Sequence, residues 1–262
     1  MPAILKNTSL GSCPSCQTPV NAASATCANC GWRFSASSAP GAEGRPVSRA
    51  FVPAGRPKIP VVVQAGFQID RTGSTASFRI GIRRSVDVIT TGIEKRASRL
   101  EAWVGTHGDL DYGEQWGLLS DRKSGDQVRH DVAGITYGGG GDAPESHLDG
   151  FHSLLEAVPW DCSFGVSRCL VGFVTDDSKP ARCGLTAESL GALFKKKDVD
   201  LYLVCEPTPT LDALVNAAGG LRFTISNDPS ISELQQVAAN VAASIVARTL
   251  AGGTKPLRSV IP

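Results

Sequence analysis

From residue 59 onward, apolar runs alternate with amphipathic stretches, and this alternation limits the possible fold more than any other feature. Residues 59–69 form an apolar, β-branched run that is typical of a strand buried on both faces. Between Phe78 and Ile93, apolar residues recur at steps of four, four, three and four, which predicts an amphipathic helix. Further strands are expected at 100–105, 115–119, 169–175, 199–205 and 222–225, and further helices at 146–157, 187–196, 211–218 and 230–250. This order predicts an α/β fold with a mostly parallel central sheet.

Four of the eight cysteines are paired near the N-terminus, within residues 10–34, in a C-x₂-C-x₁₀-C-x₂-C pattern. They are Cys13, Cys16, Cys27 and Cys30. Two such hairpins can place four thiolates at ~2.3 Å from one Zn²⁺. The pattern resembles the zinc-ribbon family, and a site filled by four thiolates is structural rather than catalytic. Protein docking is favoured for it over nucleic-acid binding. The remaining cysteines are scattered and are expected to be free thiols: Cys162, Cys169, Cys183 and Cys205.

Composition divides the rest of the chain and excludes several classes of function. Residues 35–58 are rich in Ser, Ala, Gly, Pro and Arg, which predicts a flexible linker before a second domain at 59–252 and a tail at 253–262. The formal net charge of +1 argues against a broadly basic nucleic-acid binder. No apolar run approaches the ~20 residues that a membrane-spanning helix requires. Residues 1–10 lack the apolar core of a signal peptide, so a cytoplasmic location is expected.

A short polar motif follows the first long strand. Asp70, Thr72 and Ser74 form D-x-T-x-S, and ligand sites of open α/β sheets lie at the carboxyl ends of the strands. In a loop, this spacing can bring a carboxylate and two hydroxyls to one side. Such hard oxygen ligands suit Mg²⁺. Taken alone the motif is weak evidence, because polar turns after strands are common.

Two further loops strengthen this interpretation. Gly138-Gly139-Gly140-Gly141 precedes Asp142 and Glu145, and Asp176 follows another buried strand in the sequence VTDD. Together the three loops resemble those of the von Willebrand factor A (vWA) domain, with its metal-ion-dependent adhesion site (MIDAS). The resemblance extends over about residues 59–250, and the loop motifs are similar to those of the bacterial intracellular members. It implies a Rossmann-like vWA fold with helices flanking the central sheet.

The resemblance also implies a set of ligands for Mg²⁺ or Mn²⁺. The D-x-T-x-S loop matches the family motif, and Asp176 matches an acid that holds the metal through water. The second loop departs from the common pattern, because Ala143 stands where many members have a metal-binding Thr. Glu145 matches the glutamate that coordinates directly in the integrin β-subunit version, and Asp142 could support it. Because these acids crowd one spot, removing Asp70 is expected to cost the metal-free domain little stability.

The function implied is that of a non-enzymatic adaptor, whose metal binds a carboxylate of a partner protein. Intracellular vWA proteins often work beside AAA+ ATPases or kinases in stress or phage-defence systems, so such a partner is expected. No phosphate-binding loop and no nucleophile elbow occur in the sequence.

Two alternatives remain open. The first is a metal-dependent hydrolase or phosphatase, with Glu145, Asp142 or Asp177 as the only candidates for a base. The second is nucleic-acid binding through the zinc ribbon and the arginines near it, which steep salt dependence would identify. These arginines are Arg33, Arg45, Arg49 and Arg56.

Overall fold

The computed structural model describes residues 10–12, 19–21 and 59–250, and the chain divides into two units between Ala54 and Gly55. In the first unit, β1 (Leu10–Ser12) pairs with β2 (Pro19–Asn21) in antiparallel fashion. The four cysteines predicted to bind zinc lie outside the described residues, as do the predicted linker and the tail. The zinc ribbon therefore stays a prediction.

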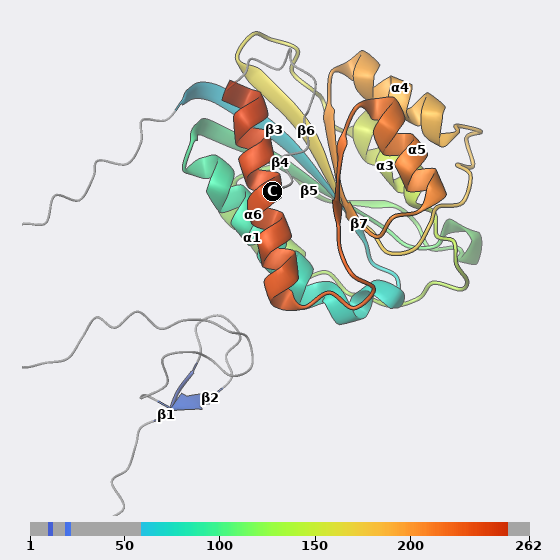
Figure 1. Cartoon of the computed structure of the whole chain (residues 1–262), viewed down its shortest axis with the longest axis horizontal. Helices are drawn as coiled ribbons and strands as arrows, with labels where there is room; N and C mark the ends of the chain where they lie inside the picture. Colours follow the sequence, from blue (N-terminus) through green and yellow to red (C-terminus); the bar gives the residue numbers. More distant parts are fainter. Residues whose placement is uncertain (1–9, 13–18, 22–58, 251–262) are drawn as a thin grey trace, which may run out of the picture. The chain divides into compact units, whose positions relative to one another are not determined.

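The second unit is an α/β domain, as the alternation of apolar runs predicts (Figure 1). Its sheet has the order β5-β4-β3-β6-β7-β8, and all neighbours are parallel except β5, which runs antiparallel to β4. The strands are β3 (Ile59–Asp70), β4 (Ala97–His107), β5 (Gly117–Lys123), β6 (Val166–Phe173), β7 (Asp200–Cys205) and β8 (Leu221–Thr224). The helices are α1 (Arg79–Glu94), α2 (Gly125–Ala133), α3 (His147–Ala157), α4 (Ala187–Lys197), α5 (Pro209–Ala218) and α6 (Ile231–Leu250), with short 3₁₀ turns at η1 (Ser74–Phe78) and η2 (Leu110–Tyr112).

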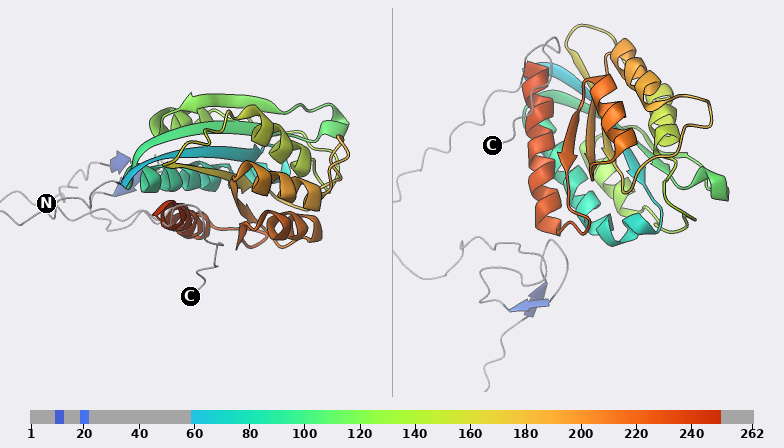
Figure 2. Two further views of the ribbon diagram at one scale, coloured as in Figure 1. Left: turned by 90° about the horizontal axis from the view of Figure 1, so that it is seen from above. Right: turned by 45° about the vertical axis from the view of Figure 1, so that its right-hand side comes forward.

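Helices cover both faces of this sheet (Figures 1 and 2). Helices α1, α2 and α6 pack on one face, where β3 contributes Val63, Phe67 and Ile69 to the core. Helices α3, α4 and α5 pack on the other face. The side chains of β3 that point away from the first core include Gln64 and Gln68, and both are buried. The strand is thus buried on both sides, but one side of it carries polar groups that need hydrogen-bond partners.

Helices α2 and α6 each begin after a serine. Helix α2 was not predicted, although Ser124 and Gln127 form a capping box at its start. At α6, the Ser230 hydroxyl accepts a hydrogen bond from the Glu233 amide, as a capping box requires. The Glu233 carboxylate, however, accepts hydrogen bonds from the amide and hydroxyl of Ser226 instead of returning to the cap residue. The segment before α6 is thereby hydrogen-bonded to the first turn of that helix.

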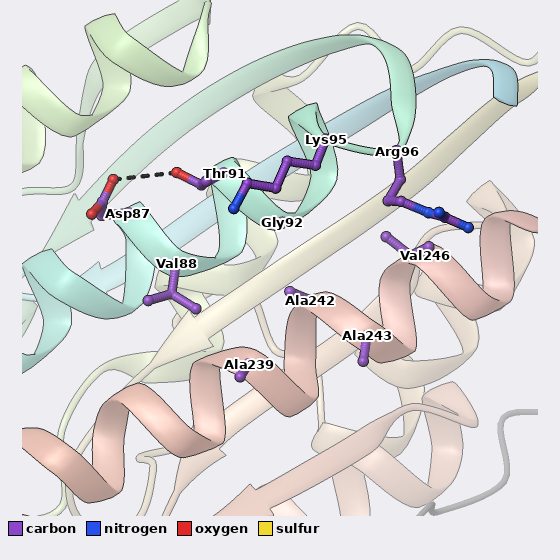
Figure 3. A pocket seen from close by; sticks show the side chains of 10 residues that line it. All are labelled: Asp87, Val88, Thr91, Gly92, Lys95, Arg96, Ala239, Ala242, Ala243 and Val246. Atoms are coloured by element: carbon purple, nitrogen blue, oxygen red, sulfur yellow. Dashed lines mark hydrogen bonds between the residues drawn. The ribbon is translucent and has the colours of Figure 1, made fainter. Parts of the chain in front are cut away.

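A groove of about 440 Å³ runs between α1 and α6 (Figure 3). Small residues bring the helices together there, and a Cβ added to Gly92 would lie 2.9 Å from the Cβ of Ala242. Lys95 and Arg96 border the groove at the end of α1. It lies on a helical face, away from the loops that follow the strands. Its lining holds a single carboxylate, that of Asp87, so it does not contain the predicted metal ligands.

Two further expectations can be compared with the described residues. Cys162, Cys169, Cys183 and Cys205 are free thiols, as predicted, and two of them are buried in the core. Among the helices of residues 59–250, none combines the length and the hydrophobicity that crossing a bilayer requires.

Candidate metal centre

The strand order brings the predicted loops to one place. From β3 the chain passes through α1 to β4 on one side, whereas β6 pairs with β3 on the other side. The carboxyl ends of β3 and β6 therefore flank the point where the strand order reverses, which is where open α/β sheets place their ligand sites. Asp70 is the last residue of β3, and Thr175 follows β6 by two positions.

Asp70 is completely buried and is held by three donors. Its Oδ1 accepts a hydrogen bond from the Thr72 amide (2.8 Å), and its Oδ2 accepts from the hydroxyls of Thr75 (2.7 Å) and Thr175 (3.2 Å). Burial opposes ionisation of this carboxyl, but the hydrogen bonds from the Thr72 amide and the Thr75 hydroxyl favour its charged form, and the pKa of Asp70 is lowered. The group is a carboxylate fixed in one orientation.

The two hydroxyls of the D-x-T-x-S motif lie together beside this carboxylate. Thr72 Oγ1 and Ser74 Oγ are 3.0 Å apart, and Ser74 Oγ is 3.1 Å from Thr175 Oγ1. Thr175 was not among the predicted site residues, although it directly precedes Asp176 at the end of a buried strand. Its position in that polar turn was the available signal. Asp176 itself is exposed and adopts a left-handed backbone conformation with φ of 58°.

The glycine-rich loop is hydrogen-bonded to the first loop through the backbone. The amide of Gly73 donates to the carbonyl of Gly139 (3.1 Å), and the amide of Gly138 donates to the carbonyl of Arg71 (2.9 Å). The Gly140 amide donates to the carboxylate of Glu114 (2.9 Å). The backbone of Gly138, Gly139 and Gly140 thus lies against the loop that follows Asp70.

Gly140 separates Thr72 from Glu145 and leaves little room for a side chain. Its φ is +76°, and an added Cβ would lie 3.2 Å from Thr72 Cβ and 3.3 Å from Glu145 Oε1. We expect Gly140→Ala to lower the free energy of unfolding by more than the roughly 1–2 kcal/mol of left-handed strain alone. Gly184→Ala is the matched control, because Gly184 has a φ of +80° and no atom within 4 Å of its added Cβ. Equal losses for both variants in urea unfolding would show that the contacts at Gly140 do not matter.

Glu145 lies at the edge of the site with only part of its carboxyl satisfied. The side chain is buried, and its Oε2 is without a hydrogen-bond partner among the described residues. Its backbone is tied to the loop after β6, since its amide donates to the Asp177 carbonyl (3.0 Å) and its carbonyl accepts from the Lys179 amide (2.7 Å). Burial, together with the charges of Asp70 and Asp109, raises the pKa of Glu145 to about 7. A cation at this point would offset that repulsion.

The other two acids of these loops have partners of their own. The Asp142 carboxylate accepts a hydrogen bond from Lys179 Nζ (2.9 Å), which also binds Asp109 (2.9 Å) and Asp111 (3.0 Å). Asp177 accepts hydrogen bonds from the amide (3.2 Å) and the hydroxyl (3.1 Å) of Thr210 at the start of α5. Asp142 therefore lies in an ion-pair cluster around Lys179, and Asp177 caps a helix.

The donor set can be tested against the metal that the sequence suggests. No three His, Cys, Asp or Glu side chains gather into a possible metal site within the described ranges. A cation here must therefore use hydroxyl oxygens as well as carboxylates. Asp70, Thr72, Ser74 and Glu145 supply hard oxygen atoms without sulfur or imidazole nitrogen, a set that fits Mg²⁺ or Mn²⁺.

Solved structures with this architecture include proximal thread matrix protein 1 (PTMP1) from the mussel byssus, with a TM-score of 0.55 and 14% identity over 71% of this chain and 47% of that chain. Another structure of PTMP1, with a zinc-occupied MIDAS motif, gives a TM-score of 0.53 and 14% identity over 73% and 46%. The VWA domain of SpRpn10 gives a TM-score of 0.51 and 16% identity over 68% and 94%. The domain has a von Willebrand A fold.

The similarity to these structures concerns the fold alone. This chain spans about half the length of the mussel structures and nearly all of the Rpn10 domain. No family model matches the chain, and no curated protein matches it in sequence. Ala143 is exposed and its side chain has no oxygen, so Glu145 is the acid of the second loop that faces Thr72 across Gly140.

Proposed function

We propose that this domain is a metal-dependent protein-interaction module. Asp70, Thr72 and Ser74 would hold Mg²⁺ or Mn²⁺ from one side, Glu145 would contribute from the second loop, and Asp176 would act through water. A carboxylate of a partner protein would complete the coordination. The observation that carries this proposal is the buried Glu145 carboxyl, which has an oxygen without a hydrogen-bond partner and lies near the ionised Asp70.

The interaction role is favoured over metal-dependent hydrolysis by the contacts of the acids. Of the three candidates for a base, Asp142 is paired with Lys179 and Asp177 is bound to Thr210. Glu145 remains, and its carboxyl faces Thr72 across Gly140, a position from which it would itself be a ligand. An enzyme would need a further base beside an open metal position. Metal-dependent hydrolysis of a phosphoester or ester by the full chain would overturn this choice.

The experiment uses the full chain, Mn²⁺ and trifluoroacetate as a carboxylate probe. Calorimetry should show saturable Mn²⁺ binding that is lost in Asp70→Ala. Fluorine NMR should then show that trifluoroacetate relaxes faster in the ternary mixture than with Mn²⁺ or protein alone. No saturable Mn²⁺ binding, or equal relaxation with wild type and Asp70→Ala, would contradict the proposal.

For the N-terminal unit, we propose one structural Zn²⁺ bound by Cys13, Cys16, Cys27 and Cys30 and a role in protein docking. The spacing of the cysteines supports this, and metal analysis of freshly purified full chain should find one zinc per chain. The free thiols of the second unit favour a reducing compartment such as the cytoplasm. An AAA+ ATPase or a kinase of a stress or defence system is the proposed partner, on the basis of the sequence resemblance.

A further inference from the structure

A chain of hydrogen bonds, buried at its centre and partly buried at both ends, links Trp116, at the edge of the sheet, to Thr175 in the candidate metal centre. Trp116 Nε1 donates to Gln68 Oε1 (3.2 Å), and Gln68 Nε2 lies 2.8 Å from His107 Nδ1. His107 Nε2 lies 2.8 Å from His147 Nδ1, and His147 Nε2 contacts the carbonyl oxygen of Thr175. Gln68, His107 and His147 are completely buried, so each of these polar groups depends on the next for its hydrogen bond.

The two ends of the chain determine the direction of every hydrogen bond in it. The indole N–H of Trp116 can only donate, and the carbonyl of Thr175 can only accept. Gln68 therefore presents its oxygen to Trp116 and its NH₂ group to His107. His107 accepts at Nδ1 and donates from Nε2, and His147 does the same toward Thr175. Both histidines are neutral Nε2–H tautomers in this arrangement, and burial lowers the pKa of each of them, that of His107 to about 3.

Two glycines make room for this chain. A Cβ added to Gly105 in β4 would lie 2.5 Å from Gln68 Oε1 and 3.0 Å from Trp116 Nε1. A Cβ added to Gly150 in α3 would lie 2.7 Å from His107 Nδ1 and 3.1 Å from Gln68 Nε2. Both glycines stand inside regular elements, where alanine is normally the more stable residue. Glycine at these two positions therefore leaves the space that the side chains of Gln68, His107 and Trp116 occupy.

The chain supports the metal loops at two points. His147 holds the carbonyl of Thr175, whose hydroxyl contacts Asp70 Oδ2 (3.2 Å) and Ser74 Oγ (3.1 Å). The backbone carbonyl of His107 accepts a hydrogen bond from the Arg71 amide (2.9 Å), directly after Asp70. The two histidines thus contact both strand ends that form the site, without lying among its oxygen ligands.

We propose that His107 and His147, oriented by Gln68 and Trp116, are positioning residues for the metal centre. They hold Thr175 and the start of the first loop so that the carboxylate and hydroxyl oxygens face one point. The positioning role rests on the metal site proposed above, whereas the assignment of the tautomers does not. Groups that orient metal ligands typically change metal affinity by roughly 10- to 100-fold when they are removed.

The test removes only the terminal donor of the chain. Replacing a histidine would leave its buried hydrogen-bond partners unsatisfied and would destabilise the domain. Trp116→Phe instead keeps an aromatic ring at this half-buried position. Trp160→Phe is the matched control, because Trp160 is also half-buried and its Nε1 donates to the Leu155 carbonyl (2.9 Å) outside the chain of histidines. Both variants and wild type are compared as full chains.

Long-range ¹H–¹⁵N spectra should show His107 and His147 as Nε2–H tautomers in wild type and in Trp160→Phe. In Trp116→Phe, the Gln68 amide loses the donor that orients it, so the His107 and His147 resonances should shift. Mn²⁺ affinity by calorimetry should fall about tenfold in Trp116→Phe, at the low end of the usual range, and stay unchanged in Trp160→Phe.

The outcomes separate the two proposals. If wild type binds Mn²⁺ and Trp116→Phe binds it equally well, or if either histidine carries its proton on Nδ1 in wild type, the positioning role is wrong. If wild type binds no Mn²⁺ but shows both Nε2–H tautomers, the proposed metal site is wrong and the positioning role falls with it. If Trp160→Phe loses as much affinity as Trp116→Phe, the effect is one of general packing, and the proposal is again overturned.

Discussion

Asp70→Ala is expected to abolish Mg²⁺ and Mn²⁺ binding and also to destabilise the metal-free domain. The carboxylate is the buried charge that anchors the proposed cation. It also accepts hydrogen bonds from the Thr72 amide and from the hydroxyls of Thr75 and Thr175, and alanine would leave these donors unsatisfied. At roughly 1–3 kcal/mol for an unsatisfied buried group, with hydroxyls free to find other partners, we expect a loss of about 2–4 kcal/mol.

This expectation differs from the one drawn from the sequence, which treated Asp70 as one of several acids that repel each other. In the structure the charged form of Glu145 is the unfavourable one, because the pKa of Glu145 is raised, whereas the pKa of Asp70 is lowered. Asp177→Ala is the control, since it removes a neighbouring acid that caps α5 and should cost roughly 0.5–2 kcal/mol without loss of metal. Urea unfolding in EDTA and calorimetry with Mn²⁺ measure the two effects. Stability of Asp70→Ala equal to wild type would contradict the account of its hydrogen bonds.

Glu145→Gln is expected to change stability and metal affinity in opposite directions. Because the pKa of Glu145 is raised to about 7 from an ordinary value of 4.5, the folded domain loses stability as the pH rises through this interval. A neutral amide of the same shape avoids the buried charge. In EDTA at pH 8, Glu145→Gln should therefore be more stable than wild type by about 1–3 kcal/mol, and little of the difference should remain near pH 4.5. Mn²⁺ affinity should fall, because an amide is a weaker ligand than a carboxylate.

Thermal unfolding of wild type and Glu145→Gln at both pH values, followed by Mn²⁺ calorimetry at pH 8, measures this directly. The acid condition is the internal control, since Glu145 is protonated there in the folded chain and only about half ionised in the unfolded chain, so little of the difference remains. A lower melting temperature for the variant at pH 8 would mean that the carboxylate is stabilised by contacts other than a cation. Unchanged metal affinity would remove Glu145 from the ligand set.

The sequence by itself determined the order of strands and helices in the second unit and the position of the first loop. Apolar periodicity depends on residues three or four positions apart, so it predicts α1 and α6 without knowledge of the rest of the chain. Asp70, Thr72 and Ser74 lie within five residues, and a tight turn alone brings them together. Helix α2 was missed because it is only nine residues long and buries just two apolar side chains, those of Val128 and Val132.

Only the tertiary structure decided which polar groups meet across the sheet. Thr175 reaches Asp70 across 105 residues because β6 pairs with β3, and His147 reaches His107 because α3 packs over the end of β4. Asp142 was expected to support the metal, but Lys179 binds its carboxylate. Local patterns predict where a chain becomes a strand or a helix. The partner of each buried polar atom depends on strand register and on the side from which the chain returns, and no short stretch of sequence contains that information.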